Sequence, residues 1–188
     1  MHRLPPALVL IDLQLAIDDP SWGQRNNPLA ESNARKLLDL WREKRWPLFH
    51  VRHDSRTPGS TYAPGQPLHA FKPETAPLDG ETVLAKTTCN AFASTDLLER
   101  LNGAETYFCG VITNNSVEST VRAAGDLGVN AYLVEDACFT VAKGRWTADE
   151  VHAMSLANLE GEYCSVVRTN WVLSKDVASF GGDHAKMT

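Results

Sequence analysis

Apolar and polar residues follow two patterns along this chain. Short continuous apolar runs predict strands buried on both faces, and longer stretches with apolar residues at helical spacing predict amphipathic helices. The predicted strands cover residues 7–12, 46–52, 81–85, 106–110, 131–135 and 163–167. The predicted helices cover 31–45, 94–101, a segment after 110 to about 127, and a segment from the capping box at 147–150 to about 159.

Strands that alternate with helices indicate right-handed βαβ units. We therefore expect an α/β protein with a three-layer, Rossmann-like fold, in which a six-stranded parallel sheet carries helices on both faces. The length of 188 residues fits a single domain over 1–188. The residues after Lys175 have the composition of a frayed tail.

The composition excludes several classes of partner. The 18 basic and 23 acidic side chains leave a net charge of −5, which argues against nucleic acid as a partner. No apolar run approaches the roughly 20 residues that span a bilayer, so we expect no membrane association. The amino terminus shows no secretory signal, and the four cysteines form no CxxC pair. Both features favour a cytoplasmic protein with reduced thiols.

Three places in the chain are candidates for chemistry, because sites in open α/β sheets lie at the carboxyl ends of the strands. Asp12 ends the first strand, and it is either a partly desolvated carboxylate that needs a partner or a helix cap. Lys86 follows the third strand, and it either pairs with Asp12 or lies in solvent. The turn 110–116 either binds an anion through backbone N–H groups or holds only a helix cap at Asn115 or Ser116.

The cysteines and the long loop at 54–80 border this region. Cys109 and Cys164 lie inside apolar strands and are expected to be buried, whereas Cys89 and Cys138 lie close to strand ends and are expected to be non-catalytic. Tyr62, in the long loop, is a candidate to cover a pocket.

Four blocks of sequence carry a resemblance to a known family. They are ALVLIDLQ at 7–14, VLAKTTCNAFASTDL at 83–97, GVITNNSVESTVRAAGDLG at 110–128 and YLVEDAC at 132–138. In this order and spacing they resemble the isochorismatase-like, or cysteine hydrolase, superfamily, which includes nicotinamidases and N-carbamoylsarcosine amidohydrolase. The resemblance implies a hydrolase of small molecules that needs no cofactor. It also implies a homodimer or homotetramer.

The resemblance also assigns roles to residues. The family's acid–base Asp maps to Asp12, its Lys to Lys86, and its nucleophilic Cys to the position of Ser116. The family's cis peptide bond maps to Val111–Ile112. The backbone N–H groups of Ile112 and Ser116 are then the expected oxyanion hole.

Serine at the nucleophile position leaves several possibilities open. A serine hydroxyl is far less acidic than a thiol, so Ser116 needs stronger activation than a cysteine would. Hydrolysis can proceed without a covalent intermediate, as in isochorismatases, or through Ser116 as a covalent nucleophile on an amide or ester. The chain can also be a variant in which Ser replaces Cys, or a small-molecule-binding member of the family that has lost turnover.

Substrate contacts and metal binding complete the expectations. Trp22, His53, Phe92 and Asn114 are the predicted substrate-binding residues. The Asp-x-His spacing that nicotinamidases use for a metal is absent, and His50 and His53 lie three residues apart on an extended segment. We therefore predict no metal site.

Overall fold

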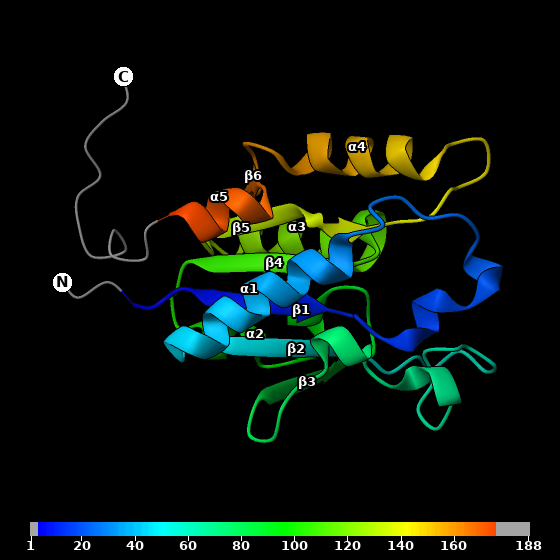
Figure 1. The fold of residues 1–188 in the computed structure, drawn as a ribbon, viewed down its shortest axis with the longest axis horizontal. Helices are drawn as coiled ribbons and strands as arrows, with labels where there is room; N and C mark the ends of the chain where they lie inside the picture. The colour runs from blue at the N-terminus through cyan, green and yellow to red at the C-terminus, as the bar shows by residue number, and fades with distance from the viewer. Residues whose placement is uncertain (1–3, 176–188) are drawn as a thin grey trace.

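Six parallel strands form one sheet in the order β3-β2-β1-β4-β5-β6 (Figure 1). The computed structural model describes residues 4–175, so the predicted tail lies outside the described residues. The strands are β1 (Ala7–Ile11), β2 (Leu48–His53), β3 (Thr82–Lys86), β4 (Thr106–Val111), β5 (Ala131–Phe139) and β6 (Ser165–Val167). The predicted α/β fold with a six-stranded parallel sheet is confirmed.

Helices cover both faces of the sheet, as expected for right-handed crossovers. They are α1 (Ala30–Lys44), α2 (Leu97–Leu101), α3 (Glu118–Asp126), α4 (Ala148–Leu159) and α5 (Thr169–Ser174). α1 and α5 pack together on one face, whereas α3 lies on the other with α4 beside it (Figure 1). Among the described residues, no helix combines the length and apolar character needed to cross a membrane.

The order of the strands places the site. From β1 the chain builds the sheet outward in one direction through β2 and β3. From β4 it builds in the other direction through β5 and β6. The crossovers after β1 and β4 therefore leave toward opposite faces, and the carboxyl ends of these two strands border an opening where ligands bind in such sheets.

Close packing of β1 against β4 depends on one glycine. Every residue of both strands is buried. Gly110 has φ +129°, and a Cβ built on it would lie 2.1 Å from the backbone oxygen of Ile11. Only glycine allows the two backbones to approach this closely.

Two boundaries differ most from the predicted ones, at the end of β5 and after β4. β5 continues to Phe139, four residues past the predicted end at Glu135. The pairing of β4 with β5 is irregular, and this irregularity allows the strand to continue past the polar pair Glu135–Asp136. After β4 the chain first forms a π-helical turn at Thr113–Val117, and α3 begins only at Glu118.

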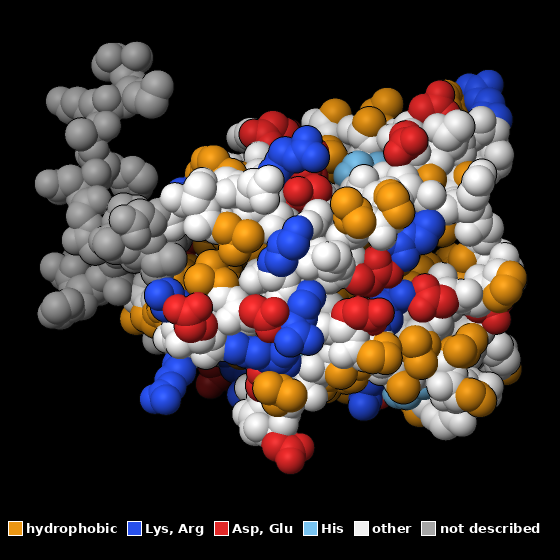
Figure 2. Space-filling model, viewed as in Figure 1, with side chains coloured by type: hydrophobic (Ala, Val, Ile, Leu, Met, Phe, Trp, Pro, Cys, Tyr) orange, Lys and Arg blue, Asp and Glu red, His pale blue; other side chains and the backbone are white. Residues whose placement is uncertain are grey.

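Charged side chains of both signs are interspersed over the face shown in Figure 2, without a large area of one sign. No group of three or more His, Cys, Asp or Glu side chains within residues 4–175 is arranged to hold a metal ion.

Candidate active site

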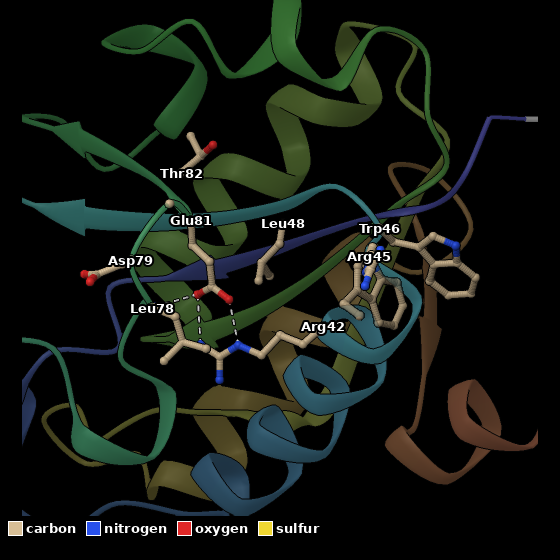
Figure 3. A pocket seen from close by; sticks show the side chains of 10 residues that line it. Arg42, Arg45, Trp46, Leu48, Leu78, Asp79, Glu81 and Thr82 are labelled. Carbon is tan, nitrogen blue, oxygen red and sulfur yellow. Dashed lines mark hydrogen bonds and ion pairs between the residues drawn. The ribbon is translucent and has the colours of Figure 1, made fainter.

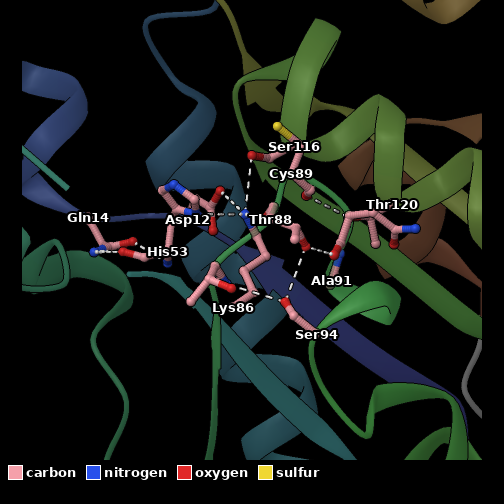
Figure 4. A network of polar contacts seen from close by, with 12 residues as sticks. Asp12, Gln14, His53, Lys86, Thr88, Cys89, Ala91, Ser94, Ser116 and Thr120 are labelled. Carbon is pink, nitrogen blue, oxygen red and sulfur yellow. Dashed lines mark hydrogen bonds and ion pairs between the residues drawn. The ribbon is translucent and has the colours of Figure 1, made fainter. Parts of the chain in front are cut away.

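The three predicted catalytic side chains meet at the carboxyl edge of the sheet (Figure 4). Asp12 directly follows β1, Lys86 is the last residue of β3, and Ser116 lies in the π-helical turn after β4. Because β2 separates β1 from β3, the long Lys86 side chain crosses the end of β2 to reach Asp12. Its Nζ lies 2.7 Å from Asp12 Oδ2 and 3.3 Å from Ser116 Oγ.

The Lys86 ammonium is fully buried and surrounded by acceptors. Besides Asp12 and Ser116, its Nζ donates to the backbone oxygen of Thr88 at 3.1 Å and lies 3.4 Å from His53 Nδ1. Burial, followed by the charge of Lys86, lowers the pKa of His53, so its imidazole is neutral near pH 7. Lys86 therefore supplies the positive charge of the site, and Asp12 balances it.

Asp12 has an uncommon backbone conformation, and one of its carboxylate oxygens has no hydrogen-bond partner among the described residues. Its φ is 51°, its N–H donates to the backbone oxygen of Val51, and its side chain is 3% exposed. Burial raises the pKa of Asp12, although the neighbouring Lys86 opposes this effect. Among the described residues Asp12 Oδ1 has no hydrogen-bond partner, so this oxygen is free to accept a proton or a hydrogen bond from a ligand.

A cavity of about 140 Å³ opens onto these groups. Asp12, Ile112 and Ser116 line it. Trp22 and His53, two of the predicted substrate-binding residues, line its wall. The other lining residues come from the segments around the site: Ile17, Ser60, Tyr62, Cys89, Val111 and Asn115.

The wall of the cavity is largely aromatic. The Trp22 and Tyr62 rings meet edge to face with centroids 6.1 Å apart, and Tyr62 meets the His53 ring in the same way at 5.7 Å. The indole N–H of Trp22 donates to the backbone oxygen of Ala16, so Trp22 offers the cavity an apolar surface. Tyr62 is the loop residue that the sequence suggested as a cover.

Two predicted substrate-binding residues lie elsewhere. Phe92 packs edge-on against Phe108, with ring centroids 6.5 Å apart, and it is not among the residues that line the cavity. Asn114 accepts a hydrogen bond from Thr140 Oγ1 at 2.6 Å and faces a different hollow beside α4. Its neighbour Asn115 lines the cavity instead. Ile17 and Ser60 were missed because no sequence motif marks them, and Asn115 was considered only as a helix cap.

The peptide bond between Val111 and Ile112 is cis, as the resemblance implies. Both Ile112 and Ser116 line the cavity, which is the placement that an oxyanion hole built from their N–H groups requires.

A second hollow, of about 450 Å³, lies at the amino ends of β2 and β3 (Figure 3). Two of its charged groups are paired, because Arg42 binds Glu81 through two contacts of 2.7 and 2.8 Å, and His50 Nε2 lies 2.9 Å from the same carboxylate. Burial alone would raise the pKa of Glu81, but the hydrogen bonds from Arg42, the Leu78 N–H and His50, together with the charge of Arg42, outweigh it and the pKa falls to about 2. The network ties α1 to the sheet.

The sequence matches the family model described as the isochorismatase domain over residues 6–170. The chain belongs to the isochorismatase family. The resemblance is thereby confirmed, and with it the class of enzyme, an isochorismatase-family hydrolase.

Similar proteins span nearly the whole chain. The uncharacterized isochorismatase family protein YrdC of Bacillus subtilis is 36% identical over 178 residues, which covers 89% of this chain and 94% of that protein. The crystal structure of a putative hydrolase of the isochorismatase family from Chromobacterium violaceum has 55% identity and a TM-score of 0.87, covering 90% of this chain and 92% of that one. The crystal structure of an isochorismatase from Pseudomonas putida has 33% identity and a TM-score of 0.80. The match covers 89% of this chain and 92% of that one.

The four thiols of this family member divide into two groups. Cys109, Cys138 and Cys164 are buried, and burial raises the pKa of both Cys109 and Cys164 to about 12 and that of Cys138 well above its ordinary value. The predicted burial of Cys109 and Cys164 is confirmed. Cys89 is exposed and lines the cavity.

Proposed function

We propose that this isochorismatase-family chain hydrolyses a small metabolite in the cavity above Asp12, Lys86 and Ser116, with Asp12 as the proton-transfer group and without a covalent intermediate. The observation that carries the proposal is the free Oδ1 of Asp12. A buried carboxylate oxygen without a partner costs stability unless a ligand or water uses it. It lies beside the fixed positive charge of Lys86.

For a carbonyl substrate, each step has a group in place. Asp12 takes a proton from a water molecule, and the oxygen of that water forms a bond to the carbonyl carbon. The N–H groups of Ile112 and Ser116 stabilise the negative charge that develops on the carbonyl oxygen. The bond to the leaving group then breaks, and the leaving group receives the proton from Asp12. Because burial raises the pKa of Asp12, the carboxylate is a stronger base than an exposed aspartate.

Lys86 and Ser116 support this chemistry without a change of their own covalent bonds. The ammonium keeps Asp12 ionised before the proton transfer, since an adjacent positive charge favours the carboxylate. Ser116 Oγ accepts a hydrogen bond from the same ammonium, which fixes the direction of the lysine side chain.

The cavity limits the substrate to a small molecule. Its volume of about 140 Å³ is below the roughly 300–1,000 Å³ of most ligand pockets. The aromatic wall formed by Trp22, Tyr62 and His53 favours a flat or apolar group next to the bond that breaks.

A covalent route through Ser116 is the second candidate, and the contact of 3.3 Å between Lys86 Nζ and Ser116 Oγ favours it. In that route Asp12 accepts the hydroxyl proton and Ser116 Oγ forms the bond to the substrate carbon. The homodimer or homotetramer stays a prediction, which sedimentation of the purified chain tests.

The test is product formation by the purified chain from a panel of small amides, esters and vinyl ethers, with the released acid, amine, alcohol or carbonyl compound quantified by mass spectrometry. Asp12→Asn is expected to lower kcat by about 10²–10⁴-fold, the usual contribution of a general acid–base group. Asp126→Asn is the matched control, because this aspartate is exposed at the end of α3, and it is expected to keep full activity.

Ser116 variants separate the routes. Without a covalent intermediate, Ser116→Ala keeps measurable turnover, and the intact mass of the acid-quenched enzyme shows no adduct. Loss of turnover in Ser116→Ala, together with an adduct on the wild-type chain, would establish the covalent route instead. Turnover by Ser116→Cys alone, with none by the wild type, would identify a binding protein that has lost catalysis. Loss of activity in Cys89→Ser but not in Asp12→Asn would overturn the assignment of the base.

A further inference from the structure

The buried face of α4 contacts the turn that carries Ser116. His152 Nδ1 lies 2.8 Å from Thr113 Oγ1, at the first residue of the π-helical turn. One turn further along α4, the Ser155 hydroxyl is shared between a carboxylate oxygen of Glu118 and the backbone oxygen of Thr113, which is 3.3 Å away. Both the side chain and the carbonyl of Thr113 therefore have partners on α4.

These contacts are polar where packing alone would use apolar residues. His152 is 8% exposed, Ser155 is 2% exposed, and Thr113 is fully buried. Desolvation of an imidazole and two hydroxyls is unfavourable unless each group has a hydrogen-bond partner in a defined place. The hydrogen bonds of these three side chains therefore fix the geometry of the turn more closely than apolar contacts would.

The imidazole of His152 is itself fixed from its far side. Asn27 Nδ2 lies 3.4 Å from His152 Nε2, and the same amide group donates to the backbone oxygens of Glu135 and Cys138 in β5 at 3.2 and 2.7 Å. The two N–H groups of this amide are used by those carbonyls, so the contact at Nε2 does not decide the tautomer. The Thr113 hydroxyl can donate or accept, and it pairs with His152 Nδ1 in either tautomer.

The backbone bonds of the turn converge on a few acceptors, and the Glu118 N–H donates to the backbone oxygens of both Thr113 and Asn115. The N–H groups of Asn115 and Val117 both point to the backbone oxygen of Ile112, at 3.0 and 3.4 Å. A π-helical turn is wider and less regular than an α-helical one. The contacts from α4 hold its first residue, three positions before Ser116.

We propose that His152, with Ser155, positions the catalytic turn, so that the side chain at position 116 stays within hydrogen-bond distance of Lys86. His152 is a positioning residue, because it lies behind the turn and does not line the cavity. The proposal rests on the site of the proposed function but not on its reaction.

The test needs no substrate. In a Cys89→Ser background, Ser116→Cys places one thiol on the cavity at position 116, whereas the other three cysteines are buried and do not line it. Nearby positive charge lowers the pKa of a thiol, so the rate of its alkylation by iodoacetamide reports its distance from the Lys86 ammonium. Mass spectrometry of the peptide that contains residue 116 measures the modification.

His152→Ala in this background is expected to slow alkylation at pH 7 by about 10-fold, because the thiol moves away from Lys86 and its pKa rises by about one unit. His152→Asn is expected to restore the rate to within about 3-fold, since its side-chain amide can donate to or accept from Thr113 Oγ1 in the place of Nδ1. Met154→Ala is the control on the outward face of α4, where Met154 is 64% exposed, and it is expected to change nothing.

Equal alkylation rates in the parent and in His152→Ala would overturn the proposal. An alkylation rate in His152→Asn as low as that in His152→Ala would also overturn the proposal. The imidazole would then support the turn only by filling space, and not through its hydrogen bond to Thr113. Lys86→Met must also slow the parent thiol, because otherwise position 116 does not sense the lysine and the positioning proposal is refuted. A clear effect of His152 on alkylation, with no turnover of any substrate, would refute the proposed function alone.

Discussion

Lys86→Met isolates the energy of the buried ion pair. Lys86 is fully buried, Asp12 is 3% exposed, and their charged atoms lie 2.7 Å apart. Methionine has a similar length and no charge, so the variant leaves Asp12 without its counter-charge. We expect the free energy of unfolding at pH 8 to fall by about 3–5 kcal/mol, the usual cost of removing one partner from a buried pair.

The magnitude follows from two opposing effects. At 2.7 Å the attraction of two unit charges is about 6 kcal/mol with an effective dielectric constant of about 20. The variant loses this attraction but no longer has to desolvate an ammonium group, so the net loss is smaller than the attraction alone.

The loss is expected to depend on pH with a definite sign. Burial already raises the pKa of Asp12, and without Lys86 the pKa rises further. A carboxyl group with a folded pKa above its unfolded value of about 3.9 stabilises the fold at low pH, and this contribution disappears as the pH rises through the folded pKa. In the variant, stability therefore falls by about 1.4 kcal/mol per pH unit while Asp12 stays protonated in the folded state.

The assay is urea unfolding followed by circular dichroism at pH 5 and pH 8. The double variant Asp12→Asn/Lys86→Met is expected to recover most of the loss, because no unpaired charge remains. Lys44→Met is the control on an exposed lysine, which lies 3.2 Å from Glu43, and its change is expected to stay within about 0.5 kcal/mol. A loss below about 1 kcal/mol for Lys86→Met at pH 8, or an equal loss at both pH values, would refute the reasoning.

Two further predictions concern the packing of Gly110 against β1 and the protonation of the buried His152. Gly110→Ala is expected to lower the free energy of unfolding by about 3 kcal/mol or more, because the added Cβ would meet the backbone of Ile11. Gly128→Ala, at φ +75° with nothing within 4 Å, is expected to lose only about 1–2 kcal/mol in the same urea assay, and equal losses would contradict the packing argument. Burial lowers the pKa of His152, so its contribution to stability is complete above its unfolded pKa of about 6.5 and is lost as the pH falls through the lower folded pKa. His152→Asn is expected to reduce the loss of stability between pH 7.5 and pH 5.5, and an unchanged loss would show that this histidine does not resist protonation.

Much of the site could be predicted from the sequence, because its three polar residues stand where apolar runs end. Asp12 and Lys86 close the runs of β1 and β3, and Ser116 follows the run of β4. In a parallel sheet these ends meet at one edge. The strand pattern therefore places the three residues at one edge of the sheet, and the family resemblance predicts that they meet there, although they lie far apart along the chain.

The predictions for Phe92 and Asn114 show where the pattern stops being informative. Asn114 and Asn115 are adjacent and identical in type, and only the π-helical turn decides that Asn115 faces the cavity while Asn114 binds Thr140. Phe92 is three residues from Cys89, which lines the cavity, yet its ring packs against Phe108 in β4. A residue's direction in an irregular segment depends on the neighbours that it meets in space.

The sequence by itself determined the layers, the parallel sheet and the edge at which Asp12, Lys86 and Ser116 meet, because strand burial and helix spacing are local periodicities that each segment carries alone. The tertiary structure decided the shape of the cavity, the free oxygen of Asp12, and the contact of His152 with the turn. These depend on distances between segments far apart in the chain, such as the 39 positions that separate Thr113 from His152. Hydrogen bonds act only over about 3 Å, so such contacts exist only once the whole chain has packed.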